Sequence, residues 1–242
     1  MNNLIELFGN HIYKTAPTNP LSARKKLCFA FSTAGLMCKY FPTKKLLPSR
    51  QFMQWAAADS AITPLKTGKN SAIVSLYLPC EILHSMGIST LFPEALACYL
   101  AAARSEQIFI DTAEQNFVSQ TMCSYHRVFL GAALNGIVPK PKCMVYTNLA
   151  CDGNMMTFPY LKERYEIPSF YIDVPYEKNY DSVMYVAKQL RELKNFLQDV
   201  TGREITEESV KKAVDKSKIA SNNYYRQLHL RKGHDIASTL TN

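Results

Sequence analysis

Short β-rich runs alternate with helical segments between about residues 70 and 176, and this alternation limits the possible fold more than any other feature. Apolar and β-favouring residues dominate three runs, at 72–78, 143–149 and 169–174. Helical segments are expected near 81–86, 93–104, 124–136 and 154–166. Strands joined through helices of this length form βαβ units and a parallel sheet. The sequence therefore predicts an α/β fold, a Rossmann-like parallel-sheet domain with helical extensions at both ends.

The chain divides into three parts on this pattern. Residues 1–68 form a helical amino-terminal segment, in which prolines are expected to separate short helices: Pro17, Pro20, Pro42, Pro48 and Pro64. Residues 69–176 form the α/β domain, and residues 177–242 a helical tail. Two long helices are expected in the tail, the first ended by Gly202 and the second capped by Thr206.

Composition favours a globular protein of the cytoplasm without nucleic-acid or membrane partners. The net charge is +8, but the 28 Lys and Arg residues are scattered among 20 acidic residues and form no basic motif with interleaved aromatics. No apolar run approaches the roughly 20 residues that span a bilayer. The amino terminus lacks a basic region followed by an apolar core, so the seven cysteines are expected to be free or metal-bound in a reducing compartment.

Two cysteines stand where a strand would pass into a helix. Cys123 opens the turn Cys-Ser-Tyr and Cys151 the turn Cys-Asp-Gly, 28 residues further on, which is about one β/α unit. Ligands of α/β proteins bind at the carboxyl ends of the strands. Paired thiolates in such turns predict a metal site.

Several segments in the same order resemble the 2-hydroxyacyl-CoA dehydratase and benzoyl-CoA reductase family of iron–sulfur proteins. The resemblance covers roughly residues 70 to 230. The matching pieces are Pro79-Cys80-Glu81-Ile82 with Gly87, Cys123-Ser124-Tyr125 with Arg127 and Gly131, Cys151-Asp152-Gly153, and Ile172-Asp173-Val174-Pro175.

The resemblance implies that Cys123 and Cys151 each donate a thiolate to a [4Fe-4S] cluster. In this family the cluster passes one electron to an acyl-CoA thioester, giving a radical anion from which a hydroxyl group leaves or in which a ring is reduced. The resemblance also implies a related second subunit and a separate ATP-dependent iron–sulfur activator protein. Family members usually continue into a second domain with a third cysteine ligand. Compared with this pattern, we expect either that the chain is a fragment or short form without that domain, or that another thiol completes the site, with Cys80 as the candidate.

Other polar residues beside these motifs are candidates for chemistry. His126 and Glu81 are candidate proton donors or acceptors, with His84 as a further possibility. Ser124 and Arg127 are candidates for positioning the substrate or the cluster. Each has a structural alternative, because a histidine often packs or caps and Glu81 suits the first turn of a helix. Four other cysteines are expected to be buried free thiols: Cys28, Cys38, Cys98 and Cys143.

Two functions remain open from the sequence. One is a subunit, or part of a subunit, of an iron–sulfur enzyme that acts on acyl-CoA thioesters. The other is a non-catalytic α/β module of the same ancestry that holds a cluster or binds a partner.

Overall fold

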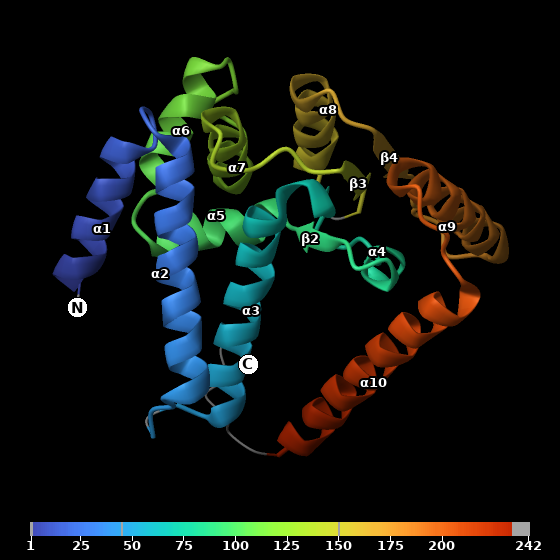
Figure 1. The fold of residues 1–242 in the computed structure, drawn as a ribbon. Coiled ribbons are helices and arrows are strands. Elements are labelled where there is room, and N and C mark those ends of the chain that lie inside the picture. Colours follow the sequence, from blue (N-terminus) through green and yellow to red (C-terminus); the bar gives the residue numbers. More distant parts are fainter. Residues whose placement is uncertain (1, 45, 150, 234–242) are drawn as a thin grey trace.

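The computed structural model describes residues 2–44, 46–149 and 151–233. Within them, a four-stranded sheet is combined with helices along the whole chain (Figure 1). The strands are β1 (Ser71–Val74), β2 (Ser89–Leu91), β3 (Cys143–Thr147) and β4 (Ser169–Ile172). The helices are α1 (Asn2–Thr15), α2 (Pro20–Tyr40), α3 (Pro48–Thr67), the 3₁₀ turn η1 (Gly68–Asn70), α4 (Glu81–Ser85), α5 (Pro93–Ala102), α6 (Glu106–Gln115), α7 (Ser124–Asn135), α8 (Gly153–Tyr165), α9 (Tyr180–Thr201) and α10 (Glu207–Arg231).

All neighbouring strands pair in parallel, in the order β2-β1-β3-β4. Val74 of β1 lies opposite Val145 of β3, and Thr147 of β3 lies opposite Ile172 of β4. Every residue of β1 and β3 is buried, as expected for central strands covered on both faces. The predicted parallel-sheet α/β class is confirmed.

The strands are shorter than the sequence predicted. The run at 72–78 leaves the sheet after Val74, because the chain turns there: Leu78 N–H bonds to the Ser75 carbonyl, and Thr147 N–H bonds to Ser75 Oγ at 3.1 Å. The runs at 143–149 and 169–174 likewise end two residues early. Strand β2 and helix α6 lie outside the predicted elements, whereas the four predicted helical segments correspond to α4, α5, α7 and α8.

Two apolar cores cover the two faces of the sheet. On one face, Tyr146 stacks on Phe158 of α8 with ring centroids 4.7 Å apart. This core also contains side chains of α1–α3 and of α5–α7. On the other face, the ring centroids of Phe170 and of Phe196 of α9 lie 5.4 Å apart. This second core also contains Leu83 of α4. The amino-terminal helices thus share a core with the α/β segment, and the domain boundaries at 68 and 176 stay a prediction.

The amino-terminal helices are longer than the prolines suggested. Helices α1, α2 and α3 contain 14, 21 and 20 residues. Pro20 and Pro48 occupy first positions of helices, where a missing N–H costs nothing. The expected break at Pro64 was wrong. Pro64 lies inside α3, three residues before its last residue, so its ring removes one helical hydrogen bond just before the helix stops.

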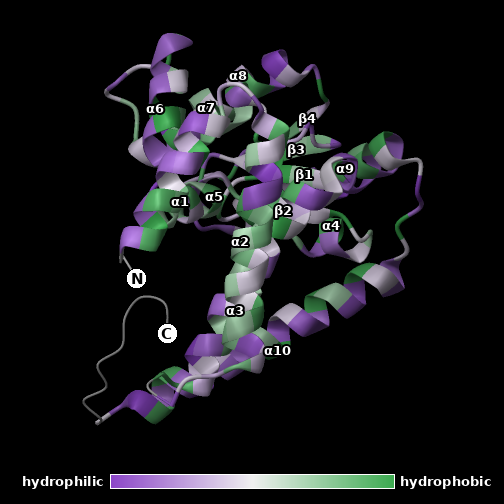
Figure 2. Cartoon of the chain, turned by 60° about the vertical axis from the view of Figure 1, so that its left-hand side comes forward, coloured by the Kyte–Doolittle hydropathy of each residue, from purple (hydrophilic) through white to green (hydrophobic). Residues whose placement is uncertain are grey.

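The tail forms the two predicted helices. Gly202 ends α9 in the left-handed region, with φ at +64°, and the Thr206 side chain accepts a hydrogen bond from Ser209 N–H at the start of α10. Helix α10 contacts the body through α4 and then runs away from it, and none of its residues is buried (Figures 1 and 2). None of the described helices is both long enough and apolar enough to cross a membrane.

Candidate functional site

The strand order makes the carboxyl edge between β1 and β3 the topological switch point of the sheet. The chain leaves β1 through α4, which packs on one face, and leaves β3 through α8, which packs on the other. Loops that diverge to opposite faces leave an opening in which ligands of open α/β sheets bind. Helix α8 begins at this edge, and a hydrogen-bonded contact between His126 and Cys151 brings the first turn of α7 to the same place.

Cys151, His126 and Thr157 form a chain of hydrogen bonds at this edge. His126 Nε2 lies 3.3 Å from Cys151 Sγ, and His126 Nδ1 lies 2.8 Å from Thr157 Oγ1. His126 and Thr157 are buried, whereas Cys151 is half-buried at the start of α8. Burial lowers the pKa of His126, and the nearby carboxylate of Glu94 opposes this effect. Burial therefore favours the neutral form of this imidazole.

Gly153 provides the space for this contact. A Cβ atom at this position would lie 2.7 Å from both Cδ2 and Nε2 of His126, and 3.3 Å from Cys151 Sγ. Distances under 3.0 Å are not found for real Cβ atoms. The glycine of the Cys-Asp-Gly turn thus has a definite role, because any side chain there would occupy the place of the imidazole.

Cys123 caps the amino terminus of α7, and its side chain is exposed. Cys98 of α5 is also exposed, and the pKa of Tyr125 is raised chiefly by this thiol and further by Cys123, so the three side chains are neighbours. The expectation that Cys98 is buried was wrong, since its position on α5 faces outward. Cys38 is only partly buried, whereas Cys28 and Cys143 are buried as expected.

The donor chemistry of Cys123 and Cys151 fits a thiolate-bound cofactor. Both thiols are accessible and lie at helix amino termini, where the helix dipole stabilises negative charge. Cys80 fits less well: burial raises the pKa of this thiol to about 12, and its sulfur donates to the Leu78 carbonyl at 3.3 Å. Within residues 2–44, 46–149 and 151–233, no three His, Cys, Asp or Glu side chains are grouped so as to hold a single metal ion. Cluster binding stays a prediction for all three thiols.

Arg127 and Ser124 lie on the same turn as His126 but differ in their surroundings. Arg127 Nη1 forms an ion pair with Glu114 Oε1 of α6 at 2.7 Å, with both side chains mostly buried. This pair joins α6 to α7 and gives Arg127 a structural role. Ser124 is exposed at the first position of α7 and is open to a ligand.

Glu81 and His84 lie on α4, which packs on the opposite face of the sheet from His126. Glu81 Oε1 accepts a hydrogen bond from Ser217 Oγ of α10 at 2.6 Å. His84 Nε2 lies 3.2 Å from Thr90 Oγ1, and burial lowers the pKa of His84. The structure therefore does not bring Glu81 or His84 together with His126 and Cys151.

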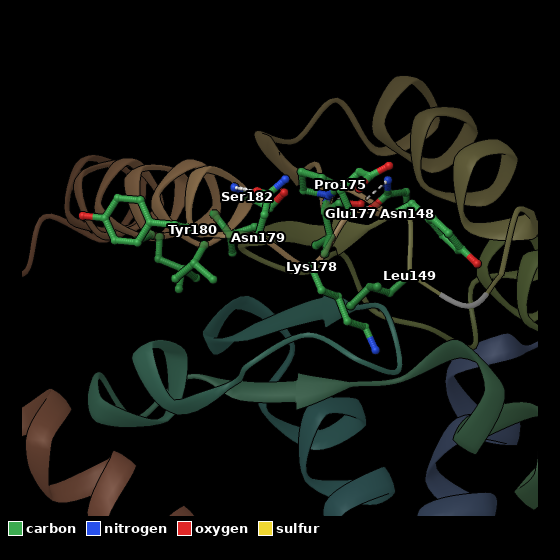
Figure 3. Close-up of a pocket in the computed structure, with 14 residues that line it drawn as sticks. Asn148, Leu149, Pro175, Glu177, Lys178, Asn179, Tyr180 and Ser182 are labelled. Atoms are coloured by element: carbon green, nitrogen blue, oxygen red, sulfur yellow. Dashed lines mark hydrogen bonds between the residues drawn. The ribbon is translucent and has the colours of Figure 1, made fainter.

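A groove of about 1350 Å³ begins at the loop that carries Cys151 and follows the carboxyl edge past β4 to α9 (Figure 3). Two loops border the groove, one after β3 and one after β4. The side chains of Leu149 on the first loop and Lys178 on the second point toward the same side of it. Asp173 immediately precedes the lining residue Val174, and its carboxylate accepts hydrogen bonds from the lining residue Asn148 and from the hydroxyls of Tyr171 and Tyr185, at 2.9–3.3 Å. The remaining walls are mainly aliphatic, from Val174, Pro175, Val183, Val186, Ala187 and Leu190.

A family model supplies the decisive comparison. The model of the 2-hydroxyglutaryl-CoA dehydratase D-component matches residues 75–241, about two thirds of the chain. The chain belongs to this family. The matched region contains Cys80, Cys123 and Cys151, and the resemblance inferred from the motifs is confirmed.

Two curated relatives agree with this assignment. The chain is 24% identical over 157 residues to the (R)-phenyllactyl-CoA dehydratase alpha subunit of Clostridium sporogenes, covering 61% of this chain and 39% of the relative. It is 25% identical over 162 residues to the lactoyl-CoA dehydratase subunit alpha of Anaerotignum propionicum, covering 57% of this chain and 38% of the relative. The chain thus matches about two fifths of the length of these D-component relatives.

Glu94 is a site residue that sequence reasoning missed. It lies in the first turn of α5, close enough to His126 to affect its pKa, and its Oε2 atom is buried without a hydrogen-bond partner among the described residues. The sequence shows only an acidic residue after Pro93, which is ordinary at a helix start. Its position beside His126 depends on how α5 packs against α7.

Proposed function

We propose that the chain is a subunit, or part of a subunit, of a 2-hydroxyacyl-CoA dehydratase. One observation supports this proposal most directly: helices α7 and α8 begin close together, in contact through His126 and Cys151. The turns that contain Cys123 and Cys151 thus lie at one edge of the sheet, in a chain that belongs to the D-component family. Both relatives are named as dehydratases of 2-hydroxyacyl-CoA thioesters, which supports this substrate class.

Cys123 and Cys151 are the residues that would hold a [4Fe-4S] cluster. Soft thiolate ligands suit iron–sulfur clusters, and both thiols are accessible. When bound, the cluster would supply a single electron to the thioester. His126 contacts Cys151, and Glu94 lies close enough to His126 to affect its pKa, so either side chain could hold or move a proton close to the reacting thioester.

The groove along β4 and α9 is the proposed site of the acyl-CoA. Its aliphatic walls suit the extended apolar arm of the thioester, and the Lys178 ammonium at its border suits an anionic phosphate. Because the groove starts at the loop that carries Cys151, a thioester bound there would have one end close to that sulfur. A related second subunit and an ATP-dependent activator protein complete the proposed enzyme.

Anaerobic reconstitution tests the proposal. The chain is incubated with iron and sulfide, alone and with a candidate partner subunit, and bound iron and sulfide are measured together with the electron paramagnetic resonance spectrum. We expect Cys123→Ser and Cys151→Ser to lose the cluster and Cys38→Ser, a partly buried thiol on α2, to keep it. Cys80→Ser and Cys98→Ser identify which additional thiol takes part.

Turnover separates the two candidate functions. A reconstituted complex that dehydrates a 2-hydroxyacyl-CoA when the activator and ATP are added supports the enzyme. A stable cluster without turnover in the same complex supports the non-catalytic module. Failure of Cys151→Ser to change the iron content would contradict both the proposed enzyme and a cluster-holding module, and would leave only a module that binds a partner.

A further inference from the structure

The Thr157 hydroxyl determines which nitrogen of the His126 imidazole carries a hydrogen. Thr157 is fully buried, so its O–H group needs an acceptor. Within the described part of the chain, its hydrogen-bond partner is His126 Nδ1 at 2.8 Å. Other helical threonines donate instead to the carbonyl four residues earlier: Thr15, Thr33, Thr67, Thr112 and Thr201.

Nδ1 is therefore the acceptor of this hydrogen bond. If Nδ1 carried the hydrogen, the buried Thr157 O–H would be left without an acceptor, which costs more than an ordinary hydrogen bond contributes. An imidazole whose Nδ1 is a bare acceptor carries its hydrogen on Nε2. Nε2 faces Cys151 Sγ at 3.3 Å, a distance at which sulfur accepts a hydrogen bond.

We propose that His126 is a positioning residue for Cys151. Held by Thr157 in the tautomer that carries its hydrogen on Nε2, it donates a hydrogen bond to Cys151 Sγ and fixes the direction in which the sulfur faces. Gly153 makes this hydrogen bond possible, because the imidazole occupies the space that a Cβ atom at position 153 would fill. Sulfur that carries negative charge, as a thiolate or in a metal–thiolate bond, is stabilised by such a donor.

The hydrogen bonds in this inference are a property of the polypeptide, whereas their role toward a cluster rests on the proposed function. The test therefore uses the metal-free, reduced chain. Long-range ¹H–¹⁵N spectra distinguish an N–H nitrogen from a bare one in each imidazole, and the signals of His126 are assigned by their loss in His126→Gln. We expect Nε2 to carry the hydrogen in the wild-type chain.

Matched variants separate this role from simple packing. Thr157→Val keeps the shape of the side chain without its hydroxyl, and Thr157→Ser keeps the hydroxyl. One hydrogen bond in a buried site corresponds to about a tenfold change in an equilibrium. We expect Thr157→Val to shift the tautomer ratio of His126 by about tenfold toward Nδ1–H, and Thr157→Ser to leave it unchanged.

The orientation of the sulfur gives the second measurement. Three-bond couplings report whether Cys151 keeps one χ1 rotamer. A Gln amide can place an N–H near the position of Nε2, whereas an Asn amide is too short to reach it. We expect one rotamer in the wild-type chain, His126→Gln and Thr157→Ser, and rotamer averaging in His126→Asn and Thr157→Val.

A wild-type His126 with its hydrogen on Nδ1, or equal tautomer ratios in the wild-type chain and Thr157→Val, would overturn the inference. The wild-type spectrum alone decides the tautomer if a variant fails to fold. A chain that shows the Nε2–H tautomer but never takes up a cluster would disprove the proposed cluster and leave this inference intact.

Discussion

Replacing Gly131 by alanine should strongly destabilise the protein. Gly131 lies in α7 where this helix crosses α6, and a Cβ atom there would lie 1.6 Å from the Phe109 carbonyl oxygen and 2.4 Å from its carbon. These neighbours are backbone atoms, so no rotamer change relieves the overlap. The helices would have to separate by roughly 1.5–2 Å to restore van der Waals contact, and Phe109, which is fully buried, would move with α6.

The magnitude follows from two opposing effects. Alanine favours a helix over glycine by about 1 kcal/mol. Overpacking of a rigid core commonly costs about 1–3 kcal/mol, and more where backbone must move. We therefore expect Gly131→Ala to lower the free energy of unfolding by at least about 2 kcal/mol, which for a chain of this length lowers Tm by roughly 4–8 °C.

Gly35 provides the matched control. It lies in α2, where the nearest atoms to an added Cβ are Ala58 Cβ and Trp55 Cδ1, both at an ordinary 3.5 Å. Helix propensity then dominates, so Gly35→Ala should raise the free energy of unfolding by about 0.5–1 kcal/mol. Urea denaturation followed by circular dichroism measures both variants. A Gly131→Ala chain as stable as the wild type would refute the close crossing of α6 and α7.

Three further predictions concern a buried thiol, an ion pair and the space beside His126. Burial raises the pKa of the Cys143 thiol to about 12. The unfolded chain releases this proton first as the pH rises, so the stability that Cys143 contributes is full below its ordinary value of 9.0 and is lost toward pH 12. Urea midpoints between about pH 8 and pH 11 should therefore fall less steeply in Cys143→Ala, and equal slopes would contradict this. Glu114→Gln should lower the unfolding free energy by about 1–2 kcal/mol, because it removes the counter-charge of a mostly buried guanidinium. Glu208 forms an exposed ion pair with Lys212, so Glu208→Gln should change the unfolding free energy by less than about 0.5 kcal/mol. Equal losses of stability in Glu114→Gln and Glu208→Gln would contradict this prediction. Gly153→Ala should displace the imidazole and cost about 1–3 kcal/mol, with Cys151 losing its single rotamer; an unchanged rotamer would argue against the contact.

The sheet and the tail could be predicted because their signals are local. Runs of β-favouring residues between helical segments gave the parallel class, and Gly202 and Thr206 marked helix ends through their own backbone and side-chain chemistry. Strand β2 has only three residues, which is too short for periodicity to reveal. Pro64 misled because proline near the end of a helix removes a single hydrogen bond.

The candidate site could be predicted only in part. The turns of Cys123 and Cys151 were recognisable, and both lie at helix amino termini. Only Cys151 follows a strand, however. The expected strand before Cys123 was wrong, because helix α6 and a loop precede that turn. The contact of His126 with Cys151 joins elements 25 residues apart and depends on helix packing, which local patterns do not contain. The same limit explains why Glu94 was missed and why Cys98, on the outer side of α5, was expected to be buried.

Two glycines show how this packing produces the site. Gly131 lets α7 lie against the backbone of α6, which sets the position of α7, and His126 lies five residues earlier on the same helix. Gly153 then leaves open, at the start of α8, the space into which the imidazole fits. A side chain at either position would separate His126 from Cys151 without changing any polar group. The arrangement of Cys151 at the carboxyl edge therefore depends as much on the absence of two side chains as on the thiol, the imidazole and the hydroxyl that are hydrogen-bonded there.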